Sequence, residues 1–201
     1  MPKQLLIIFY RNPELGKVKT RLAAGIGDEK ALAVYYLLSK HTRDITEALL
    51  FDKVIFYTDY IDKEDSWSNV SFIKEVQPYG DLGKKMEQAF IWSFERKYEK
   101  VCIIGTDCFE LNAAIINEAF DQLSKNDCVI GPAKDGGYYL LGMKKMYSEL
   151  FKNKRWSTDE VYNQTIADFE KLKLSYYKLP LLSDIDTEED LPLHWLNLLK
   201  K

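Results

Sequence analysis

The chain has 201 residues, a length typical of one folded domain. Its 46% hydrophobic and 29% charged residues are those of an ordinary globular protein, and a formal net charge of −3 argues against nucleic-acid binding, which favours a basic face. No apolar run is long enough to span a bilayer and no signal-peptide pattern opens the chain, so we expect a cytoplasmic protein.

Short apolar runs alternate with segments of helical spacing along the whole chain. Strands are predicted at 5–10, 53–58, 71–76, 101–104, 128–130, 137–142 (antiparallel) and 175–179. Helices are predicted at 29–50 (capped by Asp28), 82–98, 112–123, 158–172 (capped by Ser157 or Thr158) and from Thr187 onward. This alternation predicts one α/β domain over 1–201, with a mostly parallel sheet covered on both faces and ligands at the carboxyl ends of the strands.

The loop after the first strand is the most basic segment of the chain, with four basic residues against one acidic residue, Glu14. A strand, a glycine-containing basic loop and a helix in this order can hold phosphate, because backbone N–H groups and the helix N-terminus face the anion. A solvated loop with a chance cluster of charges is the alternative. The residues that we expect to bind phosphate here are Arg11, Gly16, Lys17, Lys19 and Arg21.

Carboxylates follow two later segments that should reach the same edge of the sheet. Asp107 comes just after the strand at 101–104, where it could also cap a turn. Near the C-terminus, Thr187 and Asp190 form a capping box, which leaves Asp184 and Asp186 without a structural role. Positions two apart in an extended segment point the same way, and a pair of carboxylates from Asp107 and Asp186 would provide hard oxygen ligands for Mg²⁺ or Mn²⁺.

Two glycine-containing segments, Gly80-Asp81-Leu82-Gly83 and Asp135-Gly136-Gly137, lie at predicted loops of the same edge. Adjacent glycines permit positive φ and a close approach of the backbone to a ligand, although a tight turn has the same requirement. Taken singly, each segment is better explained by a turn.

Several familiar sites are not indicated by the sequence. No G-x-G-x-x-G follows the first strand, no G-x-x-x-x-G-K-[ST] occurs, and no G-x-S-x-G is present, which argues against dinucleotide oxidoreductases, P-loop NTPases and serine hydrolases. Cys102, Cys108 and Cys128 lack C-x-x-C spacing, so neither a disulfide framework nor a zinc site is expected. His41 and His194 have no partner at metal-ligand spacing.

Six segments occur in a fixed order along nearly the whole chain. They are Asn12-Pro13-x-x-Gly16-x-Val18-Lys19-Thr20-Arg21-Leu22, Gly80-Asp81-Leu82-Gly83, Gly105-Thr106-Asp107-Cys108, Asp135-Gly136-Gly137-Tyr138-Tyr139-Leu140-x-Gly142, Trp156-Ser157-Thr158 and Asp184-Ile185-Asp186-Thr187-x-x-Asp190-Leu191. Together, these segments resemble the bacterial rSAM/selenodomain-associated glycosyltransferase family, a branch of the nucleotide-diphospho-sugar transferases with the GT-A fold. The Lys19-Thr20-Arg21-Leu22 element is also similar to the triphosphate loop of phospholactate guanylyltransferases.

The resemblance implies a three-layer α/β/α sandwich whose N-terminal half binds a nucleotide. It assigns nucleotide phosphates to Lys19 and Arg21, which would also act in catalysis, and a divalent cation to Asp107 and Asp186. The loop at 135–137 would line the pocket of the sugar or acceptor. The nucleotide-binding set is Arg11, Gly16, Lys17, Gly80, Asp81 and Gly83, and the substrate-binding set is Asp135, Gly136 and Gly137.

Three positions depart from the family pattern. Arg11 replaces a Lys, which keeps the charge but changes its geometry, and Lys85 replaces an Arg, which removes bidentate contact. Phe109 replaces a Pro after the proposed metal ligand, which could alter that turn.

These expectations favour a Mg²⁺- or Mn²⁺-dependent transferase that moves a nucleotidyl group from a nucleoside triphosphate to a phosphorylated small-molecule acceptor. Glycosyl transfer from a nucleotide-sugar would use the same contacts, and a non-catalytic nucleotide-binding protein is a third reading on the same fold. The base, the sugar and the acceptor stay open at this stage. The open edge of the predicted sheet permits a homodimer.

Overall fold

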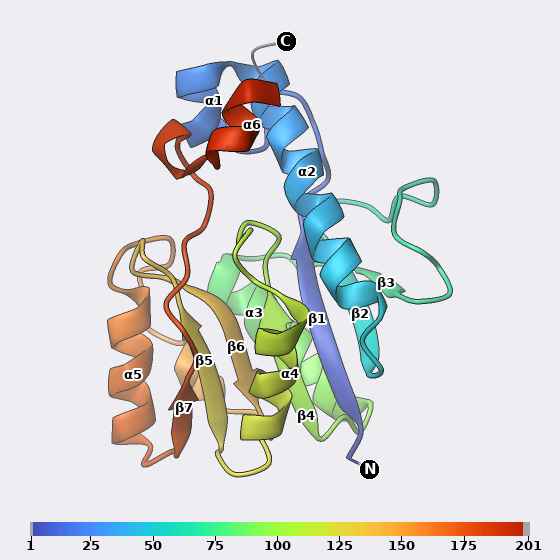
Figure 1. Cartoon of the computed structure of the whole chain (residues 1–201). Helices are drawn as coiled ribbons and strands as arrows, with labels where there is room; N and C mark the ends of the chain where they lie inside the picture. The colour runs from blue at the N-terminus through green and yellow to red at the C-terminus, as the bar shows by residue number, and fades with distance from the viewer. Residues whose placement is uncertain (1, 199–201) are drawn as a thin grey trace.

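The computed structural model describes residues 2–198. Its seven strands form one sheet in the order β3-β2-β1-β4-β6-β5-β7 (Figure 1). The elements in chain order are β1 (Gln4–Tyr10), α1 (Thr20–Ile26), α2 (Asp28–Glu47), β2 (Asp52–Tyr57), β3 (Ile73–Val76), α3 (Leu82–Glu95), β4 (Lys100–Ile104), α4 (Ala113–Gln122), β5 (Cys128–Pro132), β6 (Tyr138–Met143), η1 (Ser148–Phe151), α5 (Val161–Lys171), β7 (Tyr176–Lys178), η2 (Glu188–Asp190) and α6 (Leu193–Leu198).

The sheet is parallel except at β6, which runs antiparallel to both of its neighbours, β4 and β5. The expected mixed, mostly parallel sheet is therefore confirmed, including the antiparallel strand at 137–142. Because β6 is reversed, its first residues lie at the same edge of the sheet as the carboxyl ends of β1 and β4.

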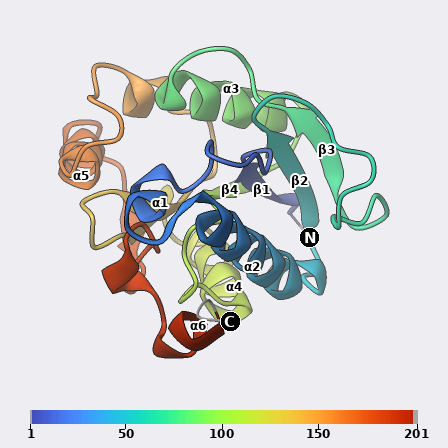
Figure 2. The ribbon, with the colours of Figure 1, turned by 90° about the horizontal axis from the view of Figure 1, so that it is seen from above.

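Helices cover both faces of the sheet, which confirms the three-layer arrangement (Figure 2). Side chains alternate along β1, since Leu6 and Ile8 belong to the core beneath α2 and α4, whereas Leu5 and Ile7 belong to the core beneath α3 and α5. Burying both faces explains why the central strands are continuous apolar runs rather than alternating ones.

A third, smaller core lies beyond the carboxyl edge of the sheet, where α1, α6 and the start of α2 pack together (Figure 1). Leu22 of α1 and Trp195 of α6 are buried in it together with Leu38 of α2. This core fixes the basic loop and the C-terminal segment side by side, above the ends of the strands.

Some predicted boundaries are wrong. The helix α1 was not expected, because the loop after β1 was predicted to continue to the cap at Asp28; the residue at the N-cap of α2 is instead Gly27. The helix α5 begins at Val161 with Glu160 at its N-cap, so neither Ser157 nor Thr158 caps it.

The last predicted helix is divided into η2 and α6, although the capping box between Thr187 and Asp190 is present as expected. Among residues 2–198, no helix has both the length and the apolar character that a membrane span requires.

Candidate active site

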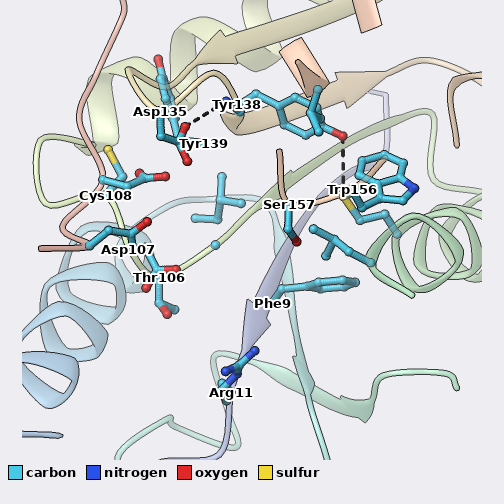
Figure 3. Close-up of a pocket in the computed structure, with 18 of the residues that line it drawn as sticks. Phe9, Arg11, Thr106, Asp107, Cys108, Asp135, Tyr138, Tyr139, Trp156 and Ser157 are labelled. Atoms are coloured by element: carbon cyan, nitrogen blue, oxygen red, sulfur yellow. Dashed lines mark hydrogen bonds between the residues drawn. The ribbon is translucent and has the colours of Figure 1, made fainter. Parts of the chain in front are cut away.

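A cleft of about 1100 Å³ lies at the carboxyl edge of the sheet (Figure 3). Its walls come from the loops after β1 and β4, the start of α3, the turn before β6, the loop before α5 and the segment before η2. Ligand sites in open α/β sheets lie at this edge, and the cleft holds most of the charged residues that the sequence singles out.

Lys19 is the residue around which the site is built. It stands at the N-cap of α1 with φ 48°, a left-handed conformation that is uncommon for a residue with a side chain. Its ammonium group lies 2.6 Å from Oδ1 of Asp107 and 3.3 Å from Oδ1 of Asp186, and donates to the backbone oxygen of Ile185 at 2.7 Å. The Lys19 side chain is 4% exposed, so a buried cation joins both predicted metal ligands.

Asp186 is positioned by the capping box that follows it. The carboxylate of Asp190 accepts hydrogen bonds from the backbone N–H groups of Asp186 and Thr187, at 3.0 and 2.8 Å. The backbone N–H of Ile185 donates to the backbone oxygen of Asp107 at 3.0 Å, which ties the C-terminal segment to the turn after β4. Arg21 then donates from Nη1 to the second oxygen of Asp186 at 3.2 Å.

Asp107 and Asp186 suit a divalent cation that is shared with a substrate phosphate. Their carboxylates are 48% and 32% exposed and both contact one ammonium group, so two hard oxygen donors meet at one open point. Residues 2–198 contain no cluster of three or more His, Cys, Asp or Glu side chains arranged to hold a metal. Two carboxylates alone do not complete the coordination of Mg²⁺ or Mn²⁺, so a cation at this point would need further oxygen ligands from phosphate or water.

Asp184 lines the cleft beside Asp186, as the two-residue spacing predicts, but differs from it in environment. Burial, followed by the negative charges of Asp107 and Asp135, raises the pKa of Asp184 to about 7. The carboxyl group of Asp184 is therefore partly protonated near neutral pH.

The predicted phosphate loop is only partly inside the cleft. Arg11 lines it and donates from Nη1 to the backbone oxygen of Lys17 at 3.2 Å. Lys17 itself is outside the lining, with its ammonium paired to Glu14 at 2.6 Å, and Gly16 is also outside, where φ +74° turns the chain.

Of the segment at 80–83, Leu82 lines the cleft, whereas Gly80, Asp81 and Gly83 do not. The side chain of Asp81 caps α3 by accepting from the backbone N–H of Lys84 at 2.8 Å. A Cβ added at Gly83 would lie 2.1 Å from Nε1 of Trp156, so this glycine provides the space for that ring.

The turn at 135–137 contributes two of its three predicted residues. Asp135 and Gly137 line the cleft, and Oδ1 of Asp135 accepts from the backbone N–H of Gly137 at 2.9 Å. Gly136 does not line it; its φ of +88° and a distance of 2.1 Å from an added Cβ to the backbone oxygen of Asp159 require glycine. The turn is thereby packed against the loop before α5.

Several lining residues were not assigned to the site from the sequence. Most of them come from the loop before α5. Three signals in the sequence pointed to members of this set: the motif Trp156-Ser157-Thr158, the departure from the family pattern at Lys85, and Asp184 two residues before Asp186. They are Gln77, Lys85, Trp156, Ser157, Thr158, Asp159 and Asp184.

Phe109, which departs from the family pattern, packs where the turn after Asp107 meets the C-terminal segment. Its ring lies 4.7 Å from that of His41 and 4.6 Å from that of Trp195. Phe109 therefore contributes aromatic packing behind the site. The Nε2 atom of His41 lies 2.8 Å from the backbone oxygen of Leu111, and this contact helps to fix the orientation of the ring against Phe109.

A family model described as "Uncharacterized protein conserved in bacteria (DUF2064)" matches residues 41–158. The chain belongs to this family. A crystal structure from Desulfovibrio desulfuricans G20, described as a candidate nucleotide-diphospho-sugar transferase, is 30% identical to this DUF2064 protein, with a TM-score of 0.86 and coverage of 93% of this chain and 84% of that one. No curated protein sequence matches the chain.

More distant solved structures share the fold. The inositol-1-phosphate CTP transferase from T. maritima is 14% identical to this DUF2064 protein with a TM-score of 0.56, covering 100% of this chain and 96% of that one. The glucosyl-3-phosphoglycerate synthase from Mycobacterium tuberculosis, solved with Mn²⁺, UDP and glucosyl-3-phosphoglycerate, is 11% identical with a TM-score of 0.52, covering 98% and 76%. The structural neighbours of this DUF2064 protein thus include a nucleotidyltransferase and a glycosyltransferase.

Proposed function

We propose that this protein is a divalent-metal-dependent transferase that acts on a nucleoside triphosphate or a nucleotide-sugar. One observation carries the proposal: the Lys19 ammonium joins Asp107 and Asp186 at the open floor of a cleft that Arg11, Arg21 and Lys85 also line. Paired carboxylates and several cations around one cleft suit a metal-bound phosphate chain.

The favoured reaction is nucleotidyl transfer from a nucleoside triphosphate to a phosphorylated acceptor. The acceptor phosphate would attack the α-phosphorus in line and pyrophosphate would leave. Asp107 and Asp186 would hold Mg²⁺ or Mn²⁺, which when bound neutralises phosphate charge. Lys19 and Arg21 would stabilise the charge that develops on the phosphate oxygens, so catalysis would come from positioning and electrostatics.

Glycosyl transfer from a nucleotide-sugar is the second candidate. The Mn²⁺ and UDP bound to the structurally similar glucosyl-3-phosphoglycerate synthase favour it. The two reactions differ in the bond that breaks: nucleotidyl transfer releases pyrophosphate, whereas glycosyl transfer releases a nucleoside diphosphate.

A screen of nucleoside triphosphates and nucleotide-sugars by thermal shift, with Mg²⁺, with Mn²⁺ and with EDTA, tests the proposal. A ligand that binds the folded protein raises its melting temperature. We expect one nucleotide to stabilise the protein only in the presence of metal, and incubation with that ligand and a panel of acceptors to release pyrophosphate or the diphosphate. Metal-independent stabilisation without turnover would instead favour a nucleotide-binding protein, and no stabilisation by any nucleotide would overturn the proposal.

A further inference from the structure

The ammonium group of Lys19 has as many protein partners as it has hydrogens to donate. Oδ1 of Asp107 lies 2.6 Å from its Nζ atom, the backbone oxygen of Ile185 lies at 2.7 Å and Oδ1 of Asp186 lies at 3.3 Å. An ammonium group has three N–H donors and no acceptor. A substrate phosphate could therefore accept a hydrogen bond from Lys19 only if the ammonium group gave up one of these three contacts.

The oxygens that a metal would use are engaged in the same way. The ammonium group contacts the same atom, Oδ1, of both Asp107 and Asp186. The second oxygen of Asp186 accepts a hydrogen bond from Nη1 of Arg21 at 3.2 Å. Mg²⁺ binds carboxylate oxygens at about 2.0–2.1 Å, closer than an ammonium group does, and two cations at such separations repel each other. Lys19 and a divalent ion therefore compete for these carboxylates.

The charges that meet at this point already cancel. Lys19 and Arg21 supply two positive charges, and the carboxylates that they contact supply two negative ones. Asp184 lies near the same group, where the charge of Lys19 favours its ionised form and the charge of Asp107 opposes it. Even with Asp184 ionised, adding a divalent ion would leave these side chains with a net positive charge. Nucleotide phosphates are anions that can compensate this charge and offer both basic residues another partner.

The ammonium group of Lys19 can move without a change in the fold. The backbone oxygen of Lys19 accepts from the N–H of Ala23 at 2.8 Å, so the first turn of α1 holds the backbone in place. The side chain is a flexible four-carbon stem, which lets the charged end change partners over several ångströms. Arg21 also lines the cleft, and its side chain is 71% exposed.

We propose that Lys19 occupies the position between Asp107 and Asp186 until a nucleotide binds. Its ammonium group then moves to the nucleotide phosphates and leaves both carboxylates to the metal. Lys19 thereby makes metal binding depend on the nucleotide. This inference rests on the proposed function, because it assigns the order in which that site is filled.

Binding of Mn²⁺ to the nucleotide-free protein tests the inference, with electron paramagnetic resonance reporting the concentration of unbound ion. Lys19→Met removes the charge and nearly keeps the length of the side chain. One unit charge within about 4–6 Å changes proton binding to a carboxylate by about 1–3 pKa units, and its effect on a divalent ion is larger. We therefore expect Lys19→Met to bind Mn²⁺ at least about tenfold more tightly than the wild type.

Lys85→Met is the matched control, because it removes one positive charge from the same cleft. Lys85 lines the cleft but forms no ion pair in the part of the chain that the structure describes. We expect its Mn²⁺ affinity to stay within about threefold of the wild type, since charges that are not in contact are screened by salt. The double variant Lys19→Met/Asp107→Asn should lose the gain, because the ion then lacks one of its two carboxylates.

Lys19→Gln is a second uncharged variant and covers the case in which Lys19→Met does not fold. Its amide can donate to the backbone oxygen of Ile185, which accepts from Lys19 in the wild type. We expect the same gain in Mn²⁺ affinity. Melting curves of both variants in EDTA establish that the protein used in the titrations is folded.

Equal Mn²⁺ affinity of the wild type and the folded Lys19 variants would overturn the inference, and so would a gain that Lys85→Met shares in full. The titrations contain no nucleotide, so they are independent of the thermal-shift screen. Metal-dependent stabilisation by a nucleotide without a gain in the Lys19 variants rejects the inference alone. A gain in these variants without stabilisation by any nucleotide rejects the proposed function.

Discussion

The Nζ atom of Lys19 lies 2.6 Å from Oδ1 of Asp107, and this contact joins the first loop of the chain to the turn after the central strand β4. The same ammonium group reaches Asp186, from the C-terminal segment, at 3.3 Å. Without a buried cation, two carboxylates this close would repel each other. Lys19 thus holds the candidate metal ligands together in the protein alone, and a divalent ion would enter an arrangement that is already formed.

Asp107→Asn keeps the size of the side chain but removes the charge that a metal requires. We expect metal-dependent stabilisation by the nucleotide to weaken at least as much as the roughly 10–100-fold typical when residues that support a metal site are replaced. The thermal-shift titration with Mn²⁺ and with EDTA measures this. Asp121→Asn, outside the cleft, is the control, and unchanged metal-dependent binding in Asp107→Asn would remove Asp107 from the site.

The left-handed backbone of Lys19 gives a second prediction. Lys19→Ala and Lys19→Gly both remove the ammonium, but glycine adopts φ 48° without the steric cost that a Cβ adds and is also the better N-cap residue. We expect the free energy of unfolding of the glycine variant to be about 1 kcal/mol higher than that of the alanine variant, so that the glycine variant is the more stable of the two.

Urea denaturation of the two variants measures this difference. The matched pair Lys17→Ala and Lys17→Gly serves as a control, because Lys17 is exposed and is not among the residues with positive φ. A glycine at position 17 should give no gain in stability. Equal stability of the two variants at position 19 would contradict the left-handed conformation.

The central part of the fold could be predicted because its signals are local. The strands β1 and β4 are apolar runs bounded by turn residues, and the capping box of Thr187 and Asp190 is a pattern of four residues. The helix α1 escaped prediction because its seven residues contain a glycine and depend on tertiary packing, in which Leu22 is buried against α2.

The site could be predicted at the level of its loops but not of each side chain. The carboxyl ends of parallel strands lie at one edge of the sheet, so Asp107 is near the basic loop whatever conformation the two loops adopt. Which basic residue turns inward depends on the loop conformation: Lys17 pairs with Glu14 outside the cleft, whereas the left-handed turn at Lys19 directs its side chain inward. The orientation of each basic side chain depends on contacts between segments that are distant in the sequence, and it cannot be predicted from a local sequence pattern.

Gly83→Ala tests how Trp156 is held. The new Cβ would lie 2.1 Å from Nε1 of Trp156, and the stack on Phe151 restricts the movement of the ring. We expect a loss of about 1–2 kcal/mol in unfolding free energy, because the overpacking exceeds the gain from replacing a glycine in a helix, together with a shift in tryptophan fluorescence.

Gly105→Ala is the matched control for this substitution. It also lies in the cleft, but an added Cβ there meets nothing within 4 Å. Its stability should therefore stay within about 0.5 kcal/mol of the wild type. If Gly83→Ala were equally neutral, Trp156 would not be packed on Gly83.

The raised pKa of Asp184 predicts how stability depends on pH in the metal-free protein. Its pKa is about 7 in the folded state against an ordinary 3.8, so the folded protein retains a proton that the unfolded chain releases between these values. Stability therefore falls as the pH rises from about 4 to 7, and the full penalty, up to about 4 kcal/mol, applies above pH 7.

Asp184→Asn removes this penalty. In EDTA, we expect the melting temperature of the variant minus that of the wild type to be larger at pH 8 than at pH 4.5. For Asp121→Asn, the same difference should not change with pH. The sign follows from the cause, because burial and the charges of Asp107 and Asp135 destabilise the ionised carboxylate. A difference that stays constant with pH would mean that Asp184 is ionised throughout, and the crowding of these carboxylates would then be relieved by solvent.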